Sequence, residues 1–183
     1  MMTLNFKPFP VIETDRLTLR QMIREDADEL FFLRSDPHVM KYIERPRAKT
    51  VDDAVAYINM INIQTEANEV AYWAITLRNE NKLIGTICLW KFEIENHRCE
   101  IGYMLHPDFH RKGIMKETLD TILNYGFTSL KLHTVYANIN PENNASRLLL
   151  LNAGFIQEAY LRENFFYNGK YLDTALFGII SPL

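Results

Sequence analysis

A short basic loop, His110-Arg111-Lys112-Gly113-Ile114-Met115, separates a strand-like run that ends at Leu105 from a helix-like run that reaches about Phe127. The first amides of a helix have no partner within the helix, and the helix dipole favours negative charge there. Gly113 has no Cβ, so the backbone at this point can approach a phosphate closely. The arginine and lysine of the loop add positive charge. The succession of strand, loop and helix therefore predicts an anion-binding site.

Hydrophobic periodicity assigns the rest of the chain to strands of period two and helices of period 3.6. Thr50 and Asp53 predict a capping box at one helix start, and Asn168-Gly169 predicts a tight hairpin turn. This order predicts an α/β (α+β) fold, with a mixed central sheet flanked by helices, as a single domain over residues 1–183. We expect strands over 16–22, 70–77, 83–90, 98–105, 133–139, 155–161 and 171–180, and helices over 24–35, 50–66, 115–127 and 143–153.

Composition excludes several classes of function. The formal net charge is −3, whereas a broad nucleic-acid surface needs a basic face. No apolar run approaches the roughly 20 residues that span a bilayer, so we expect a soluble, cytoplasmic protein without a membrane partner. Cys88 and Cys99 are the only cysteines, which predicts two reduced, partly buried thiols. No ligand spacing typical of a metal site occurs.

A second segment extends the loop motif to a family. Residues 140–155, Asn-Pro-Glu-Asn-Asn-Ala-Ser-Arg-Leu-Leu-Leu-Leu-Asn-Ala-Gly-Phe, follow another predicted strand. Together with the loop, this segment resembles the GNAT superfamily of N-acetyltransferases. The opening Glu13–Arg20 and the segment Asp36–Met40 resemble its RimJ/RimL-like branch. The resemblance implies acetyl-CoA as cosubstrate, and a GNAT-like sheet whose fourth and fifth strands, 98–105 and 133–139, splay apart to admit the pantetheine arm.

The resemblance also implies which residues bind acetyl-CoA. Backbone amides of the loop would hold the pyrophosphate, with His110 as a further candidate donor, although a lone loop histidine is commonly only solvated. His110 and Met115 depart from the family pattern, and helical spacing predicts that the Met115 side chain points into the core. The strand backbone at Met104 and Leu105 would pair with pantetheine. The expected cosubstrate-binding residues are Met104, Leu105, His110, Arg111, Lys112, Gly113, Ile114, Met115 and Asn143.

Asn143 has two interpretations that are compatible. The resemblance implies that Asn143 binds the pantetheine amide, whereas its position before a short helix predicts an N-cap. A cap residue at the edge of a cleft can serve both purposes.

Glu100 is the candidate general base. Carboxylates are depleted in strands, and Gly102 next along the same face leaves room for a ligand. The resemblance implies that a glutamate in this strand acts as the base and accepts the proton of the attacking amine, directly or through water. The alternative is a solvated or salt-bridged strand residue near Arg98.

Ser146 is the candidate donor to the leaving thiol. The family often places a tyrosine four residues before its Gly-Phe pair, and that position is Leu150 here. The substitution leaves Ser146 or water to protonate the thiolate. A first-turn serine that only satisfies backbone groups is the alternative.

These residues predict an enzyme that moves acetyl from acetyl-CoA to a primary amine by direct attack, without a metal or a covalent enzyme intermediate. The acceptor would be a small amine or a protein N-terminus, not a nucleic acid, and a homodimer is plausible for the group. Two alternatives remain: a non-catalytic acyl-CoA sensor on the same fold, and an unrelated nucleotide-binding module that shares only the basic loop.

Overall fold

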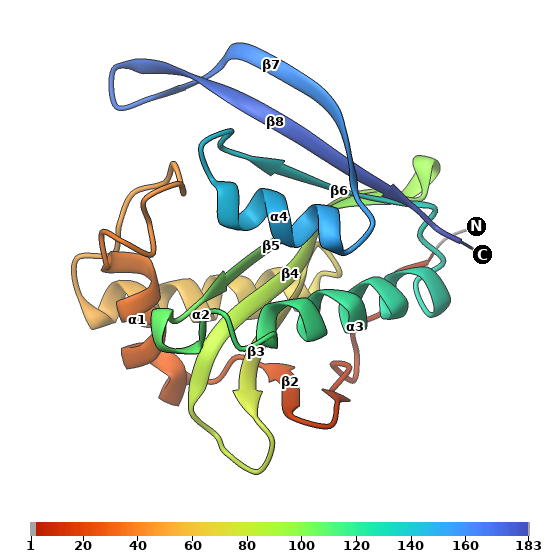
Figure 1. Ribbon diagram of the computed structural model, residues 1–183. Helices are drawn as coiled ribbons and strands as arrows, with labels where there is room; N and C mark the ends of the chain where they lie inside the picture. Colours follow the sequence, from red (N-terminus) through yellow and green to blue (C-terminus); the bar gives the residue numbers. More distant parts are fainter. Residues whose placement is uncertain (1–2, 183) are drawn as a thin grey trace.

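The computed structural model describes residues 3–182 and contains one eight-stranded mixed sheet in the order β1-β2-β3-β4-β5-β6-β8-β7 (Figure 1). Among neighbouring strands, only β5 and β6 run parallel. The strands are β1 (Ile12–Glu13), β2 (Leu17–Gln21), β3 (Ala71–Leu77), β4 (Leu83–Glu93), β5 (Arg98–Leu105), β6 (Thr134–Ile139), β7 (Ile156–Tyr167) and β8 (Lys170–Ile180). The helices are α1 (Ala27–Ser35), α2 (Val51–Glu66), α3 (Ile114–Thr128) and α4 (Asn144–Asn152), with 3-10 turns η1 (Arg24–Asp26), η2 (Ile94–Asn96) and η3 (Pro107–Phe109).

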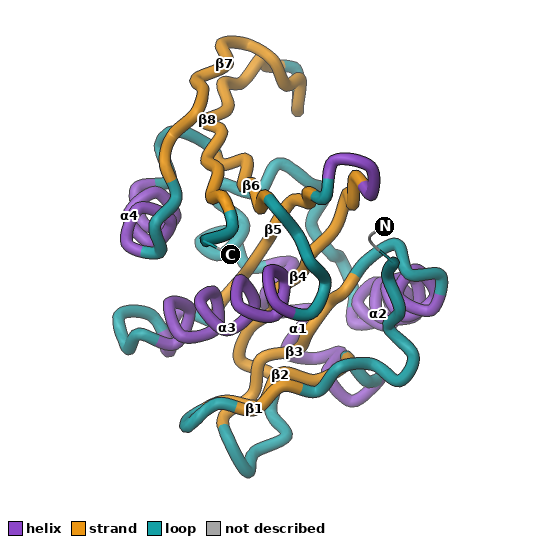
Figure 2. The backbone as a smooth tube through the Cα atoms, turned by 90° about the vertical axis from the view of Figure 1, so that its right-hand side faces the viewer, coloured by secondary structure: helices purple, strands orange, loops and turns teal. Residues whose placement is uncertain are grey.

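The central strands have two faces because successive side chains point to opposite sides of the sheet. On one side, Ile101 packs in a core cluster with Leu119 of α3 and Leu150 of α4; we call this the α3–α4 face. On the other side, Tyr72 packs with Ile58 of α2 and with residues of α1; we call this the α1–α2 face. Figure 2 shows α4 and α2 on opposite sides of the sheet. Strand β5 therefore presents residues to two different helix layers.

The ladder between β5 and β6 is short. The paired residues are Arg98 with Thr134, Cys99 with Val135, and Glu100 with Tyr136. Within residues 3–182, Ile101 to Leu105 have no partner on β6, although β6 continues beside β8 as far as Ile139. The predicted splay is thus present, and it leaves one edge of β5 open between the two faces.

Several local predictions are confirmed. Thr50 Oγ1 accepts a hydrogen bond from the Asp53 amide at 3.3 Å, and Asp53 Oδ2 accepts one from the Thr50 amide at 3.0 Å, which completes the capping box. Asn168 and Gly169 have φ values of 49° and 76° at the tip of the β7–β8 hairpin, as a type I′ turn requires.

Several predicted boundaries are wrong; the strand expected over 83–90, for example, continues to Glu93. The helix expected over 24–35 begins with the 3-10 turn η1, and the strand expected to end at residue 161 continues to Tyr167. Register shifts in β7 between Gln157 and Ala159, and between Leu161 and Phe165, interrupt the alternation that the prediction used. Among the described helices, none is both long and apolar enough to cross a bilayer.

Candidate active site

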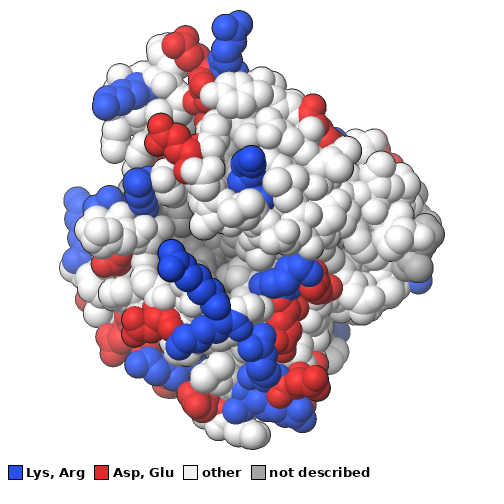
Figure 3. All heavy atoms as spheres, in the orientation of Figure 1, with Lys and Arg blue, Asp and Glu red and all other residues white. Residues whose placement is uncertain are grey.

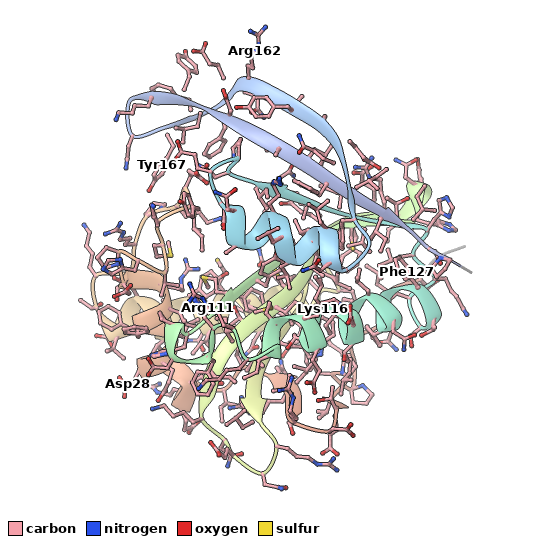
Figure 4. All side chains as sticks on the ribbon, viewed as in Figure 1. Asp28, Arg111, Lys116, Phe127, Arg162 and Tyr167 are labelled. Atoms are coloured by element: carbon pink, nitrogen blue, oxygen red, sulfur yellow. The ribbon has the colours of Figure 1, made fainter. Side chains whose placement is uncertain are left out.

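The start of α3 offers unpaired backbone amides. Gly113 is the N-cap residue with φ 74° and ψ 1°, and no side chain caps the helix there. The first amides of α3 therefore have no partner within the helix. Arg111 also adopts a left-handed conformation, with φ 59°. Figure 4 shows Arg111 in the loop before α3 and Lys116 on its first turn. This geometry fits a diphosphate held by backbone N–H groups.

Side chains at the α3 start are divided between the core and the solvent. Ile114 and Met115 are buried in the main hydrophobic cluster, so the prediction that Met115 points inward is confirmed. Arg111 and Lys112 are exposed. His110 Nε2 lies 3.0 Å from the Leu105 carbonyl oxygen, and because a carbonyl only accepts, the ring nitrogen donates. The histidine therefore ties the loop to the end of β5 through one of its two ring nitrogens.

Arg16, which was not among the expected site residues, contacts the same loop. Its Nη1 donates to the Lys112 carbonyl at 3.0 Å, and its Nε donates to Glu117 Oε2 at 2.6 Å. Thr14 Oγ1 donates to the other oxygen of Glu117 at 2.6 Å. These bonds, with desolvation opposing them, lower the pKa of Glu117. The N-terminal segment thus fixes the loop through contacts that span about a hundred residues of sequence, which no local pattern reveals.

A hydroxyl pair bridges the splay on the α3–α4 face. Tyr103 Oη of β5 lies 2.5 Å from Ser146 Oγ of α4, and either oxygen can donate. Burial raises the pKa of Tyr103 to about 12, with the Ser146 hydrogen bond opposing it. Tyr103 therefore stays protonated at neutral pH and can donate a proton or a hydrogen bond. Sequence analysis selected Ser146 but missed Tyr103, because an aromatic residue in a strand usually belongs to the core.

At the start of helix α4 the predicted N-cap is confirmed. Asn143 is its N-cap, and its Oδ1 accepts a hydrogen bond from the Ser146 amide at 3.1 Å. Leu150, at the position where the family often has a tyrosine, is fully buried in the core. That position supplies no acid here, and the hydrogen-bonded hydroxyl groups of Tyr103 and Ser146 are the candidates that remain.

Glu100 lies on the α1–α2 face and is 7% exposed. Its Oε2 accepts a hydrogen bond from Lys91 Nζ at 2.8 Å. The salt-bridged interpretation therefore holds with Lys91 as partner instead of Arg98, whose Nε lies 3.4 Å from Glu93. Lys91 reaches Glu100 because β4 is irregular between Trp90 and Glu93. A carboxylate in this position, beside the open edge of β5, can accept a proton from an incoming amine.

Gly102, next to Glu100 along the same face, has close neighbours. A Cβ at this position would lie 3.3 Å from Cys88 Sγ and 3.8 Å from Trp90 Nε1. Tyr136 of β6, which is paired with Glu100, closes the other side and is also buried. Burial and the negative charge of Glu100 raise the pKa of Tyr136. The expectation that Gly102 leaves room for a ligand stays a prediction, because Cys88 and Trp90 already lie at contact distance from the position of a Cβ.

The surface around the splay is hollowed. Figure 3 shows a depression between the lobe of α4 with the β7–β8 hairpin and the lobe that carries α3, and Lys and Arg side chains border its lower edge. No group of three or more His, Cys, Asp or Glu side chains within residues 3–182 has the arrangement of a metal site.

Known proteins share this architecture. The sequence model of the acetyltransferase (GNAT) domain family matches residues 16–156 of this chain. The uncharacterized N-acetyltransferase YoaA of Bacillus subtilis is 33% identical over 95% of this chain and 98% of its own length. The uncharacterized N-acetyltransferase p20 of Bacillus licheniformis is 36% identical over 91% of this chain and 94% of its own.

Solved structures agree in fold. A GNAT-family acetyltransferase from Bacillus anthracis superposes with a TM-score of 0.83 at 27% identity, covering 95% of this chain and all of its own. Spermidine N-acetyltransferase from Vibrio cholerae, in complex with CoA and spermine, superposes with a TM-score of 0.80 at 26% identity. The match covers 92% of this chain and 97% of that structure's chain. The family match and the relatives together show that this chain belongs to the GNAT acetyltransferases and is an acetyl-CoA-dependent N-acetyltransferase.

Proposed function

We propose that the chain transfers the acetyl group of acetyl-CoA directly to a primary amine, of a small molecule or of a protein N-terminus. One observation carries the proposal: the open edge of β5 joins the uncapped α3 start on one face to Glu100 on the other. A thioester that lies in this gap can be reached from both faces. We further propose that one domain over residues 1–183 performs the whole reaction in the cytoplasm.

The cosubstrate would be held mainly by backbone groups. Amides at Gly113, Ile114 and Met115 bind the diphosphate, and the exposed side chains of Arg111 and Lys112 add positive charge around it. The free edge of β5 at Met104 and Leu105 offers backbone groups to the pantetheine amides. The Asn143 side-chain amide remains at the entrance of the gap, with its oxygen already engaged by the α4 cap.

The chemistry would divide between one carboxylate, that of Glu100, and the hydroxyl pair of Tyr103 and Ser146. Glu100 accepts the amine proton, directly or through a water molecule, and the neutral amine attacks the thioester carbonyl. The carbon–sulfur bond breaks, and the Tyr103–Ser146 pair donates a proton to the departing thiolate. Backbone N–H groups of β5 stabilise the negative charge on the carbonyl oxygen.

Direct transfer is favoured over an acetyl-cysteine intermediate by the state of the nearest thiol. Burial raises the pKa of Cys88 to about 12, with the positive charge of Arg45 and a backbone hydrogen bond opposing it. A thiol with such a pKa is protonated at neutral pH and is a poor nucleophile. Cys99 is buried as well, and burial raises its pKa further.

The relatives point to two acceptor classes. A relative from Vibrio cholerae, 29% identical, is a spermidine N(1)-acetyltransferase, and one from Escherichia coli, 26% identical, is a [ribosomal protein uS5]-alanine N-acetyltransferase. Both acceptors are primary amines, which supports the reaction class. Neither identity fixes the acceptor of this chain.

The test is thiol release from acetyl-CoA with a panel of amines and N-terminal peptides, combined with mass spectrometry of the products. We expect one new acetyl group on an amine nitrogen for each thiol released. Tight acetyl-CoA binding without turnover on any amine would support the sensor alternative instead. ATP or NAD binding as tight as that of CoA would support the nucleotide module.

A further inference from the structure

Two guanidinium groups on the α1–α2 face lack a carboxylate partner. Arg34 and Arg45 form no ion pair within 4.0 Å with any carboxylate of residues 3–182. Each lies over an aromatic ring instead: Arg34 Cζ is 3.6 Å from the centroid of Tyr57, and Arg45 Cζ is 4.9 Å from that of Trp90. Ring contacts hold the guanidinium planes in place and leave their N–H groups available.

The carboxylates around these arginines already have partners. Glu100 is paired with Lys91 at 2.8 Å, and Glu44 accepts a hydrogen bond from Asn140 Nδ2 at 2.8 Å. Asp36 accepts from the His38 and Val39 amides, and Asp53 accepts from the Lys49 and Thr50 amides. None of these carboxylates forms an ion pair with Arg34 or Arg45, so both guanidinium groups keep N–H donors for a ligand.

Arg45 is linked to the candidate base through a tryptophan. Arg45 lies over the ring of Trp90, and Trp90 is the β4 residue that pairs with Glu100. The charge of Arg45 lowers the pKa of both Cys88 and Tyr57, against the larger effect of burial, and that of Arg34 also acts on Tyr57. The Trp90 ring thus contacts two cations, Arg45 and Lys91, and its Nε1 lies 3.8 Å from the position of a Cβ on Gly102.

We propose that the acceptor is a primary amine that also bears an anionic oxygen group, a carboxylate or a phosphate, which Arg45 binds with help from Arg34. This inference rests on the proposed acetyl transfer and names its substrate class. Arginine binds such oxygens through two parallel N–H groups, which fixes orientation as well as affinity. A polyamine would meet like charge at this entrance, so spermidine is disfavoured as acceptor, in contrast to the relatives that carry that name.

The experiment compares amines that differ only in the anionic group. Thiol release is measured with β-alanine against its amide and with phosphoethanolamine against ethanolamine, and separately with spermidine. These two pairs distinguish a carboxylate from a phosphate. The variants are Arg45→Gln and Arg34→Gln. The matched control is Arg162→Gln, because Arg162 lies on the β7–β8 hairpin and points away from the body of the molecule (Figure 4).

We expect the wild type to prefer one anionic amine over its neutral partner by about tenfold or more in kcat/KM. Arg45→Gln should remove that preference by lowering kcat/KM for the anionic amine, and Arg162→Gln should keep it. Equal turnover of both partners, a preference for spermidine, or an unchanged preference in Arg45→Gln would overturn the inference and leave the acetyl transfer intact.

A second measurement separates failure of the inference from failure of the proposed reaction. If no amine releases thiol, acetyl transfer to amines is itself contradicted. Calorimetric titration of N-acetyl-β-alanine and of its amide into the protein with CoA then tests the arginines alone. Binding of the two molecules with equal affinity would count against the anionic subsite, whereas tighter binding of the acid that is lost in Arg45→Gln would support it.

Discussion

On the α3–α4 face of β5, Tyr103 makes a neutral hydrogen bond to Ser146, and the neighbouring anion site is built from backbone amides. On the α1–α2 face, Glu100 makes an ion pair with Lys91 beside a tryptophan that contacts two cations. Backbone amides suit a ligand such as the proposed cosubstrate, whose diphosphate is the same whatever amine is acetylated. The second depends on side chains, which can differ without disturbing the fold. If the proposed roles of the two faces hold, the contrast teaches that cosubstrate binding and acceptor choice can vary independently.

The largest expected effect is that of Glu100→Gln, which removes the proposed base and keeps the size of the side chain. We expect kcat for thiol release to fall by about 10²–10⁴-fold, with little change in CoA binding. Glu93→Gln is the matched control, because Glu93 is also an ion-paired carboxylate at the end of β4. An unchanged kcat across pH in Glu100→Gln would remove this residue from the mechanism and erase the chemical difference between the two faces.

Next in size is Tyr103→Phe, which removes one hydroxyl of the pair that bridges the splay. We expect kcat to fall by roughly 10–100-fold, since a buried donor to the leaving thiolate is lost. The KM for the amine should stay the same, because the acceptor enters from the other face. Ser146→Ala provides the comparison: if only one of the two variants loses activity, that residue is the donor.

Gly113→Ala should act on cosubstrate binding alone. The new Cβ would lie 3.5 Å from Arg16 Nη2, an ordinary contact, but the residue must keep a φ of 74°. An L-residue in that region costs about 1–2 kcal/mol, so we expect KM for acetyl-CoA to rise several-fold while kcat changes little. Gly169→Ala, at the hairpin tip with φ 76°, imposes a similar backbone cost far from the loop. A similar rise in KM from that variant would show that the effect is not local.

The smallest effect concerns stability at high pH. The folded protein raises the pKa of Tyr103 from 10.0 to about 12, so the folded state holds its proton more tightly than the unfolded state. This contribution is fully present below pH 10 and is lost as pH rises toward about 12. Between pH 9 and pH 11, the free energy of unfolding of the wild type should fall by about 1 kcal/mol more than that of Tyr103→Phe. Parallel curves from urea titrations would contradict the assigned burial effect.

Sequence reasoning reached the parts of the site that local patterns encode. The uncapped α3 start follows from a glycine before an amphipathic run, and the inward Met115 follows from helical spacing. Arg16 and Tyr103 were missed for a physical reason. Their partners lie far along the chain, at Lys112 and Ser146, and only tertiary packing brings them together. The extent of β7 was missed because bulges break the alternation of its side chains.

The parted strands have a consequence for the protein as a whole. The sheet is joined across β5 and β6 by the pairing of Arg98, Cys99 and Glu100 with 134–136, so a bound pantetheine arm would supply rungs that the polypeptide leaves out. Occupancy would then be linked to resistance against heat, with a melting temperature that climbs with the logarithm of CoA concentration above the dissociation constant. Amide hydrogen exchange at Met104 and Leu105 should slow at the same time, because the cosubstrate would act as a removable strand.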